Sequence, residues 1–409
     1  MTNTPSWIKA AIAERKQQSL FRKTVVMESA QSPSVRIDDS DYLAFCSNDY
    51  LGLANHPDLV KALHQSALEY GVGSGASHLV NGHSRVHQLL EEELADWLGY
   101  ERVMLFSTGY MANLGVISAL AGKNTLVLQD KLNHASLLDG AKLAEASLRR
   151  YLHNDLASAE RLLSKEMSRA KPSNDSSSGN SSNEKQSPLL VTDGVFSMDG
   201  DIAPLKKLST LAQKYSSILM VDDAHGLACI GKEGKGVMEL EGVTSHDLPL
   251  LVGTFGKAFG TSGAFVATSN DMADYLTQFA RPYIYTTAMS PAMAGATRAS
   301  LALIRSAEGQ ERREKLAKNI AFFREKANQL PISLGDSQTA IQPVIVGDSE
   351  YALLLSQQLK QRGIWCTAIR PPTVPNAGAR LRITLSARHT QQQICQLTQT
   401  LSKVMDKRG

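Results

Sequence analysis

Residues 216–226 read SSILMVDDAHG, an apolar run that ends in two acidic residues and a histidine. Such a run predicts a strand buried on both faces, as in a largely parallel sheet. Open α/β sheets bind ligands beyond the carboxyl ends of their strands. Asp222 could therefore hold a heteroaromatic nitrogen protonated, and His225 could hydrogen-bond a neighbouring oxygen of the same ring. An ordinary strand end with solvated polar residues would give the same pattern.

A lysine between glycines follows a second apolar run, in LLVGTFGKAFGTSG at 250–263. The amine of Lys257 could attack a carbonyl once it loses a proton that a free lysine holds to about pH 10.4. That loss calls for burial, nearby positive charge or imine formation with a cofactor. The glycines at 256, 260 and 263 would let a flat ligand approach the backbone. The alternative is a surface lysine in a glycine-rich turn.

Apolar runs of strand length alternate with helical patterns through the middle of the chain. The runs are 103–106, 125–128, 189–192, 218–222, 250–254 and 264–267. This alternation predicts an α/β fold with a mostly parallel central sheet flanked by helices. Helical patterns at about 292–306 and 310–330, followed by apolar runs at 341–345 and 381–385, predict a smaller C-terminal α+β domain.

These patterns divide the 409 residues into an N-terminal helix and short segment (1–45), a large α/β domain (46–288) and a small domain (289–409). Further helices are expected at 5–23, 56–70 and 84–98, the first packed on the main body or on a partner subunit. Residues 168–188 are rich in serine and almost free of apolar side chains, which predicts a disordered insertion.

Composition excludes several classes of protein. The net charge of +3 does not favour nucleic acid or an anionic membrane as partner. No apolar run is long enough to span a membrane, and the N-terminus lacks the apolar core of an export signal. The four cysteines form no C-x-x-C pair, so neither a disulfide framework nor a metal site is expected. We expect a cytoplasmic protein.

Two further stretches follow predicted strands. A helix is predicted to begin within STGY at 107–110, so the N–H groups of Gly109 and Tyr110 could bind phosphate. An ordinary strand-to-helix turn would have the same sequence pattern. His134 lies in the loop after the strand at 125–128, where an imidazole can stack on a ring or remain solvated. GLACIGKE at 226–233 is no P-loop, because Glu233 replaces the required Ser or Thr.

Arg380 and Arg382 lie two residues apart in a predicted strand of the C-terminal domain. An arginine brought over the ring could bind a substrate carboxylate in a bidentate fashion. Alternate residues of a strand share a face, so direction does not separate the two arginines. Two solvated arginines are the other interpretation.

Together these motifs resemble the α-oxoamine synthases, which are fold-type I enzymes that use pyridoxal 5′-phosphate. The resemblance covers about residues 48–389 and is carried by SNDYLGL at 47–53, GVFSMDG at 194–200 and DDAHG at 222–226. It implies that Lys257 bonds covalently to the cofactor while Asp222 pairs with the ring nitrogen. It further implies contacts of His225 with the ring oxygen, stacking of His134, phosphate binding by Gly109, Tyr110 and Thr254, and a place for Ser197 near the ring oxygen.

The resemblance also implies how substrates bind. Asn48, Thr373, Arg382 and Arg22 would handle substrate, and in a homodimer Thr286 and Thr287 would reach the neighbouring subunit's phosphate. AIRPPTVP at 368–375 is similar to the members that act in biotin biosynthesis. These join L-alanine to a pimeloyl thioester, carried by coenzyme A or a carrier protein, with loss of carbon dioxide. Alternatives are a sister synthase such as glycine C-acetyltransferase, an aminotransferase on the same fold, or a non-catalytic relative.

Overall fold

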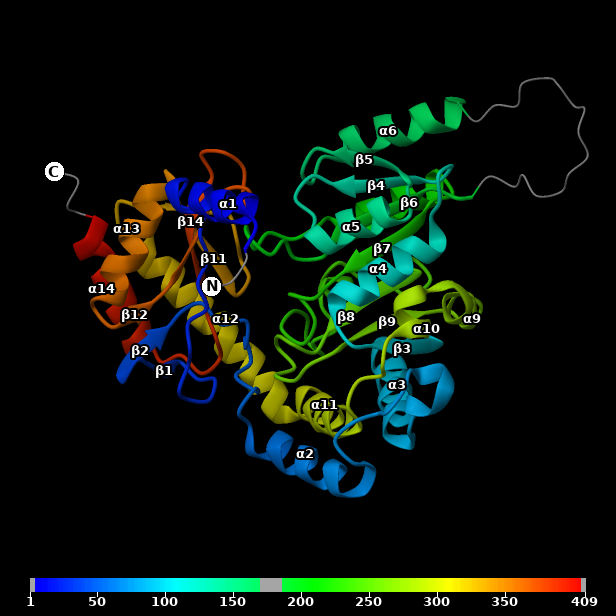
Figure 1. Ribbon diagram of the computed structural model, residues 1–409, viewed down its shortest axis with the longest axis horizontal. Helices are drawn as coiled ribbons and strands as arrows, with labels where there is room; N and C mark the ends of the chain where they lie inside the picture. Colours follow the sequence, from blue (N-terminus) through cyan, green and yellow to red (C-terminus); the bar gives the residue numbers. More distant parts are fainter. Residues whose placement is uncertain (1–3, 170–185, 406–409) are drawn as a thin grey trace, which may run out of the picture.

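A seven-stranded sheet forms the middle layer of the larger part of the molecule in a computed structural model that describes residues 4–169 and 186–405 (Figure 1). Its strand order is β3-β9-β8-β7-β6-β4-β5. The strands are β3 (Arg102–Phe106), β4 (Leu126–Asp130), β5 (Ser147–Tyr151), β6 (Leu189–Asp193), β7 (Ile218–Asp222), β8 (Leu250–Thr254) and β9 (Ala264–Thr268). Strand β9 is antiparallel to both of its neighbours, and the others pair in parallel. The mostly parallel sheet predicted from sequence is confirmed, and β5 is an additional edge strand.

Helices cover both faces of this sheet because neighbouring strand residues point to opposite sides. Met220 packs with one group of helices, whereas Leu219 and Val221 pack with the other. The first group is α4 (Gly109–Leu120), α5 (Ala135–Leu143), α9 (Asn270–Phe279) and α10 (Arg281–Tyr285). The second is α3 (Arg85–Leu98), α6 (Leu156–Arg169), α7 (Leu205–Lys214) and α8 (Val237–Leu240). Two apolar cores thus hold the strand ends in register.

The C-terminal part carries a smaller, antiparallel sheet of order β10-β11-β14-β13. Its strands are β10 (Ser333–Leu334), β11 (Ile341–Gly347), β13 (Thr367–Ile369) and β14 (Ala379–Thr384). Its helices are α12 (Ala307–Ala327), α13 (Ser349–Lys360) and α14 (Gln391–Met405). The predicted α+β character of this region is confirmed. The domain boundaries proposed at residues 46 and 289 remain a prediction.

Two elements connect the parts. The N-terminal strands β1 (Ser34–Ile37) and β2 (Ser40–Ala44) form a sheet with β12 (Ile364–Trp365), so the N-terminal segment joins the C-terminal part. Helices α2 (Pro57–Tyr70) and α11 (Pro291–Ile304) pack closely, since a Cβ on Gly295 would overlap the side chain of Ser66. The π-helical turn η1 (His78–Gly82) follows α2. The helices predicted at 56–70 and 84–98 are confirmed as α2 and α3.

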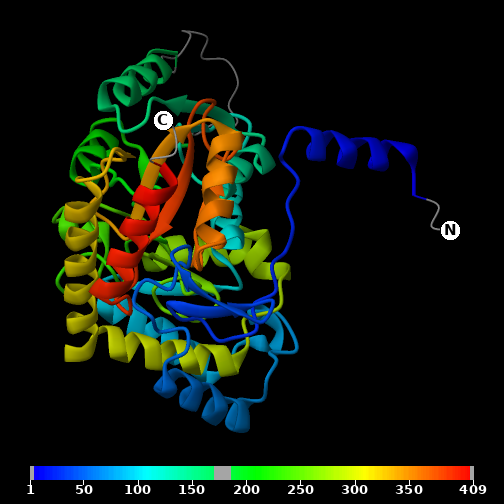
Figure 2. The same cartoon turned by 90° about the vertical axis from the view of Figure 1, so that its left-hand side faces the viewer.

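Helix α1 (Ser6–Gln17) stands apart from the body of the molecule (Figure 2). None of its residues is buried, and Trp7 is 71% exposed. The helix ends before residue 23, where the sequence predicted its end. The prediction that it packs on the main body was wrong, whereas packing on a partner subunit stays a prediction. Most of the insertion predicted at 168–188 lies outside the described residues. No described helix has the length and apolar character needed to cross a membrane.

Candidate active site

A cavity of about 210 Å³ lies at the carboxyl ends of β6, β7 and β8. The strand register places Asp193 beside Asp222, and β8 ends next to them at Thr254. All eight residues predicted to bind the cofactor line this cavity, namely Gly109, Tyr110, His134, Ser197, Asp222, His225, Thr254 and Lys257. The structure thus brings together residues from five separate stretches of sequence.

The carboxylate of Asp222 is buried and held in a fixed orientation. Asn113 Nδ2 donates to its Oδ2 at 2.6 Å, and the backbone N–H of Ala224 donates to its Oδ1 at 3.0 Å. Asn113 also donates to Ser136 Oγ at 2.9 Å, which ties α4 to α5 beneath the cavity. These bonds hold the carboxylate of Asp222 at the base of the cavity.

Lys257 follows β8 in a tight turn and brings its amine into the same cavity. The amine makes no hydrogen bond or ion pair with any residue in 4–169 or 186–405. Burial lowers the pKa of Lys257 from 10.5 to about 8; Asp222 and Asp193 act in the opposite direction, and Arg382 lowers the pKa further. Such an amine is available to act as a nucleophile or a base near neutral pH.

The two predicted histidines are positioned by different partners. His225 Nδ1 lies 2.7 Å from the hydroxyl oxygen of Tyr50, so its other ring nitrogen is left to face a ligand. Burial and the charge of Lys257 lower the pKa of His225 well below its usual value, which favours the neutral ring. His134 begins α5, where its Nδ1 lies 2.8 Å from Ser136 Oγ and its backbone N–H donates to Asp193 Oδ2 at 3.1 Å.

The start of α4 presents the backbone N–H groups that the sequence at 107–110 predicted for anion binding, and that binding stays a prediction. Thr108 caps the helix through a hydrogen bond from the N–H of Met111 at 3.1 Å. The N–H groups of Gly109 and Tyr110 remain free of partners among the described residues. Thr254 lies opposite, 3.7 Å from where a Cβ on Gly109 would stand. Free N–H groups and the positive end of the helix dipole are suited to phosphate.

The structure separates the two arginines that sequence could not. Arg382 Nε donates to the carbonyl oxygen of Ser197 at 2.6 Å, and its terminal nitrogens lie 3.2 Å from Asn48 Oδ1. Arg380 instead forms an ion pair with Asp199 and donates to the carbonyl oxygen of Met198 at 3.2 Å. Arg382 is the arginine whose charge lowers the pKa of Lys257, although its side chain does not line the cavity.

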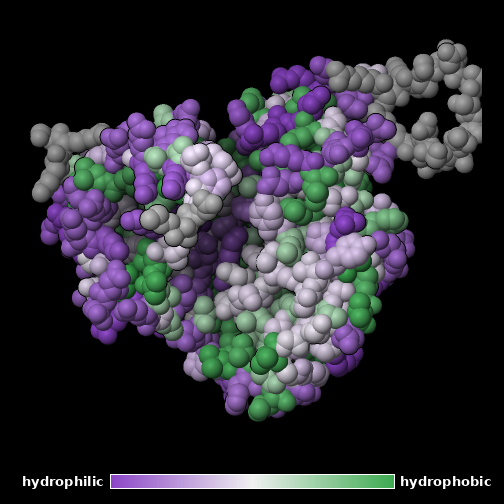
Figure 3. Space-filling view, viewed as in Figure 1, coloured by the Kyte–Doolittle hydropathy of each residue, from purple (hydrophilic) through white to green (hydrophobic). Residues whose placement is uncertain are grey.

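The other three predicted substrate residues, like Arg382, lie outside this cavity. Thr373 lines a neighbouring cavity of about 630 Å³, which shares His134 and Ser197 with the first. That cavity lies where the surface is hollowed between the C-terminal part and the central sheet (Figure 3). Asn48 contacts Arg382 without lining either cavity. Arg22 is exposed near Arg370 and lines neither cavity.

Thr286 and Thr287 also line neither cavity. The carbonyl oxygen of Thr287 accepts a hydrogen bond from Ser107 Oγ at 2.9 Å, so it lies beside the loop that leads into α4 of its own chain. Contact of these threonines with a neighbouring subunit stays a prediction.

Four residues of the site were missed in the sequence: Tyr50, Asn113, Ser136 and Asp193. Asn113 had a usable signal, because it is an amide one helical turn beyond Gly109 in an otherwise apolar helix. Asp193 ends a predicted strand just as Asp222 does. Tyr50 had no such signal, because 175 residues separate it from His225.

The arrangement fits pyridoxal 5′-phosphate on the evidence of these side chains. An unpaired amine, a buried carboxylate and the N-terminus of helix α4 share one cavity. The Oδ1 of Asn113 is buried without a partner among the described residues, which leaves it for a bound group. No cluster of three or more His, Cys, Asp or Glu suited to a metal ion occurs in the described parts of the chain.

Comparison with known families places this fold and site in a class. Residues 40–401 match the sequence model of the family described as aminotransferase class I and II. This match covers most of the 409 residues, so the chain belongs to that family. Its relatives define a narrower group: 8-amino-7-oxononanoate synthase of Marinomonas sp. (strain MWYL1) is 63% identical over 404 residues, which are 99% of this chain and 96% of the relative.

Solved structures agree with the sequence comparison. A serine palmitoyltransferase variant from S. paucimobilis, solved with bound PLP and myriocin, is similar with a TM-score of 0.88 and 30% identity, covering 98% of this chain and 97% of that chain. The 8-amino-7-oxononanoate synthase of Francisella tularensis has a TM-score of 0.75 and 32% identity, covering 90% of this chain and 99% of that chain. The predicted fold-type I architecture is thereby confirmed.

Proposed function

We propose that this protein condenses L-alanine with a pimeloyl thioester to give 8-amino-7-oxononanoate, carbon dioxide and the free thiol of coenzyme A or a carrier protein. The observation that carries the proposal is the unpaired Lys257 amine, which shares a cavity with Asp222 and the anion site of α4. The chain's high identity to a synthase of that name supports this reaction over those of sister enzymes. In cells the product is a precursor of biotin, as the sequence resemblance implied.

Pyridoxal 5′-phosphate, when bound, supplies an aldehyde that joins the amino group of alanine and a ring that stores the electron pair left at Cα. Gly109, Tyr110 and Thr254 would hold its phosphate, His134 its ring face, and Asp222 the proton on its ring nitrogen. A carboxylate next to that nitrogen would favour its protonated form. His225 and Ser197 would contact the ring oxygen.

Lys257 is the group that would move the α-proton of alanine. With a pKa of about 8, its amine is partly neutral at physiological pH and can accept a proton. Arg382 would hold the alanine carboxylate, because a guanidinium binds a carboxylate at fixed geometry. The Cα carbon then bonds to the acyl carbon of the thioester as the thiolate leaves. Loss of the carboxylate as carbon dioxide and return of a proton to Cα complete the balance.

The neighbouring cavity of about 630 Å³ would receive the acyl chain. It opens beside Ser197 and His134, so an acyl carbon placed at this junction would lie next to the cofactor ring. Thr373 lines its far side, on the loop between β13 and β14.

A homodimer accounts for apolar side chains that the single chain leaves in water. Leu68, Val72 and Val80 are 71%, 80% and 77% exposed, at and beyond the end of α2. Figure 3 shows hydrophobic residues gathered at that end of the molecule, over α2. Ser290 Oγ donates to the carbonyl oxygen of Val72 at 2.7 Å, so this segment adjoins the threonines at 286 and 287. Sedimentation at twice the chain mass, reduced by Val80→Asp, would support the dimer.

Product analysis tests the reaction directly. The purified protein would be incubated with L-alanine and pimeloyl-coenzyme A or pimeloyl carrier protein, and the product identified by mass spectrometry. We expect a mass equal to that of 8-amino-7-oxononanoate, and none with Lys257→Ala. Glycine with acetyl-coenzyme A tests the sister synthase, and a keto acid without thioester tests an aminotransferase. Turnover with either of those alone would refute the proposal.

Cofactor attachment has its own readout. A visible absorption band that borohydride bleaches in the wild type, and that Lys257→Ala lacks, would show the covalent bond between the amine and the aldehyde.

A further inference from the structure

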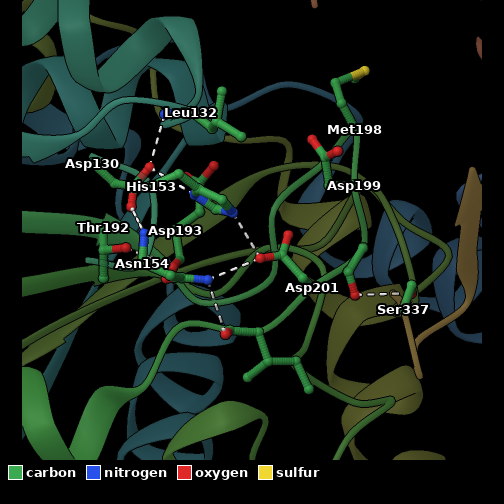
Figure 4. Close-up of polar contacts among 12 residues, drawn as sticks. Asp130, Leu132, His153, Asn154, Thr192, Asp193, Met198, Asp199, Asp201 and Ser337 are labelled. Atoms are coloured by element: carbon green, nitrogen blue, oxygen red, sulfur yellow. Dashed lines mark hydrogen bonds and ion pairs between the residues drawn. The ribbon is translucent and has the colours of Figure 1, made fainter. Parts of the chain in front are cut away.

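A histidine outside the cavity joins two carboxylates at the edge of the central sheet (Figure 4). His153 follows β5, with Nδ1 2.9 Å from Asp130 Oδ1 and Nε2 2.7 Å from Asp201 Oδ2. Asp130 is fully buried at the end of β4, where its Oδ1 also accepts the N–H of Leu132 at 2.8 Å. The imidazole therefore connects the end of β4 to a loop that begins after β6.

The neighbouring Asn154 makes the same connection a second time. Its backbone N–H donates to Asp130 Oδ2 at 2.8 Å, and its Nδ2 donates to Asp201 Oδ2 at 2.8 Å. The other oxygen of Asp201 is buried and has no hydrogen-bond partner among the described residues. Asp201 is thus held through one oxygen by two adjacent residues. Although burial opposes charge on His153, the two carboxylates raise its pKa to about 10, so the link is an ion pair on both sides.

Asp201 lies at the base of the segment we call the 194–201 loop. Phe196 N–H donates to the carbonyl oxygen of Asp201 at 3.0 Å, and Gly200 N–H donates to that of Phe196 at 2.8 Å. These bonds close a tight turn with Ser197 near its tip. The ring of Phe196 meets the ring of His153 edge-on, with centroids 4.4 Å apart. His153 thus contacts the loop through its carboxylate and through its aromatic ring.

The opposite side of the 194–201 loop is held by the C-terminal part. Ser337 Oγ and Thr339 Oγ1 each donate to the carbonyl oxygen of Gly200 at 2.9 Å. Arg382 Nε donates to the carbonyl oxygen of Ser197, and Arg380 pairs with Asp199. The loop therefore lies between two anchors, and its tip lines both cavities. Loss of one anchor would let the tip shift toward the other.

We infer that Asp130, His153 and Asp201 form a positioning network that fixes the 194–201 loop, and through it Ser197 and Arg382, for the condensation reaction. The inference deepens the proposed function, because Arg382 is the residue assigned to the alanine carboxylate. His153 itself lines neither cavity, so it acts through the loop. Misplacement of a binding group by about 1 Å can reduce the rate roughly 100-fold.

Two variants and one matched control test the network. His153→Gln removes the charged imidazole between Asp130 and Asp201 and leaves the link through Asn154, and Asp201→Asn removes the accepting carboxylate from the loop side. Leu163→Ala opens a cavity in the nearby helix α6, where Leu163 is buried, without touching the loop. The control measures what general destabilisation of this region does.

The first readout needs neither cofactor nor activity. Hydrogen exchange followed by mass spectrometry would report the amides of residues 194–201. We expect exchange there to be at least about tenfold faster in His153→Gln and Asp201→Asn than in the wild type, with Leu163→Ala unchanged in this segment. The second readout is steady-state kinetics. The KM for alanine should rise about 10- to 100-fold in both network variants, while the KM for the acyl thioester changes less.

The effects of His153→Gln and Asp201→Asn should be less than additive when combined, because both changes break the ion pair between His153 and Asp201. Network variants that keep wild-type loop exchange and KM, or that behave like Leu163→Ala, would overturn the inference. If His153→Gln does not fold, Asp201→Asn decides by the same criteria. A wild type that makes no product would refute the proposed function, while the exchange experiment would still decide whether the network holds the loop.

Discussion

The amine of Lys257 should lose its proton about two and a half pH units earlier than a free lysine. Burial lowers its pKa from 10.5 to about 8, a change in free energy of roughly 3 kcal/mol between the charged and neutral forms. At pH 7, roughly one amine in ten is then neutral, against roughly one in three thousand for an unperturbed lysine. Because the folded pKa is depressed, the neutral fraction grows as pH rises through 8.

The assay is labelling of the cofactor-free protein by a small acylating reagent, with the extent at Lys257 read by mass spectrometry at a series of pH values. Exposed lysines of the same chain serve as internal references. The labelling rate of Lys257 should reach half its maximum near pH 8. Arg382→Gln should move the midpoint upward, because the guanidinium is one cause of the low pKa. A midpoint near 10.5 in the wild type would refute the reasoning.

Three further outcomes follow from the same contacts. Asp222→Asn should lower kcat about 100-fold or more at unchanged thermal stability, since the amide takes the same place without the charge. Gly226→Ala should destabilise the fold by about 1 to 3 kcal/mol, because a Cβ there would overlap the carboxylate of Asp223. The difference in free energy of unfolding between the wild type and His153→Gln should be largest below pH 6.5. It should decrease by on the order of a few kcal/mol as pH rises toward 10, because the folded state raises the pKa of this histidine.

Each of these outcomes has a control. Undiminished turnover in Asp222→Asn, with cofactor bound, would count against its role. Gly122→Ala is the matched control for Gly226→Ala, because the position has open space around it and should show little change in the denaturation midpoint. A stability difference between the wild type and His153→Gln that does not vary with pH would contradict the ion pair with Asp130 and Asp201.

The sheet could be predicted because its strands are buried on both faces and read as unbroken apolar runs. The edge strand β5 was missed, because the exposed residues Arg149 and Arg150 interrupt the apolar pattern. The end of α1 was also predicted too late, because an amphipathic pattern does not show where a helix with no buried face stops.

The site could be predicted where it depends on strand ends, as at Asp222 and His225. Its supporting contacts could not, because the sequence separation between Asn113 and Asp222 is 109 residues, and that between Tyr50 and His225 is larger. The choice between Arg380 and Arg382 likewise could not be predicted, because it depends on the ion pair that Asp199, far away in the sequence, forms with Arg380.

The guanidinium of Arg382 is immobilised by protein atoms alone, through Ser197, Asn48 and Tyr50. An arginine that is free in solution gives up roughly 2 kcal/mol of rotamer entropy when it is fixed. Here that entropy is already lost on folding. A carboxylate that binds Arg382 would therefore lose less of its binding free energy to the ordering of the side chain. A small amino acid with a single methyl side chain has few other contacts to offer, and pre-organisation of this kind is what its recognition requires.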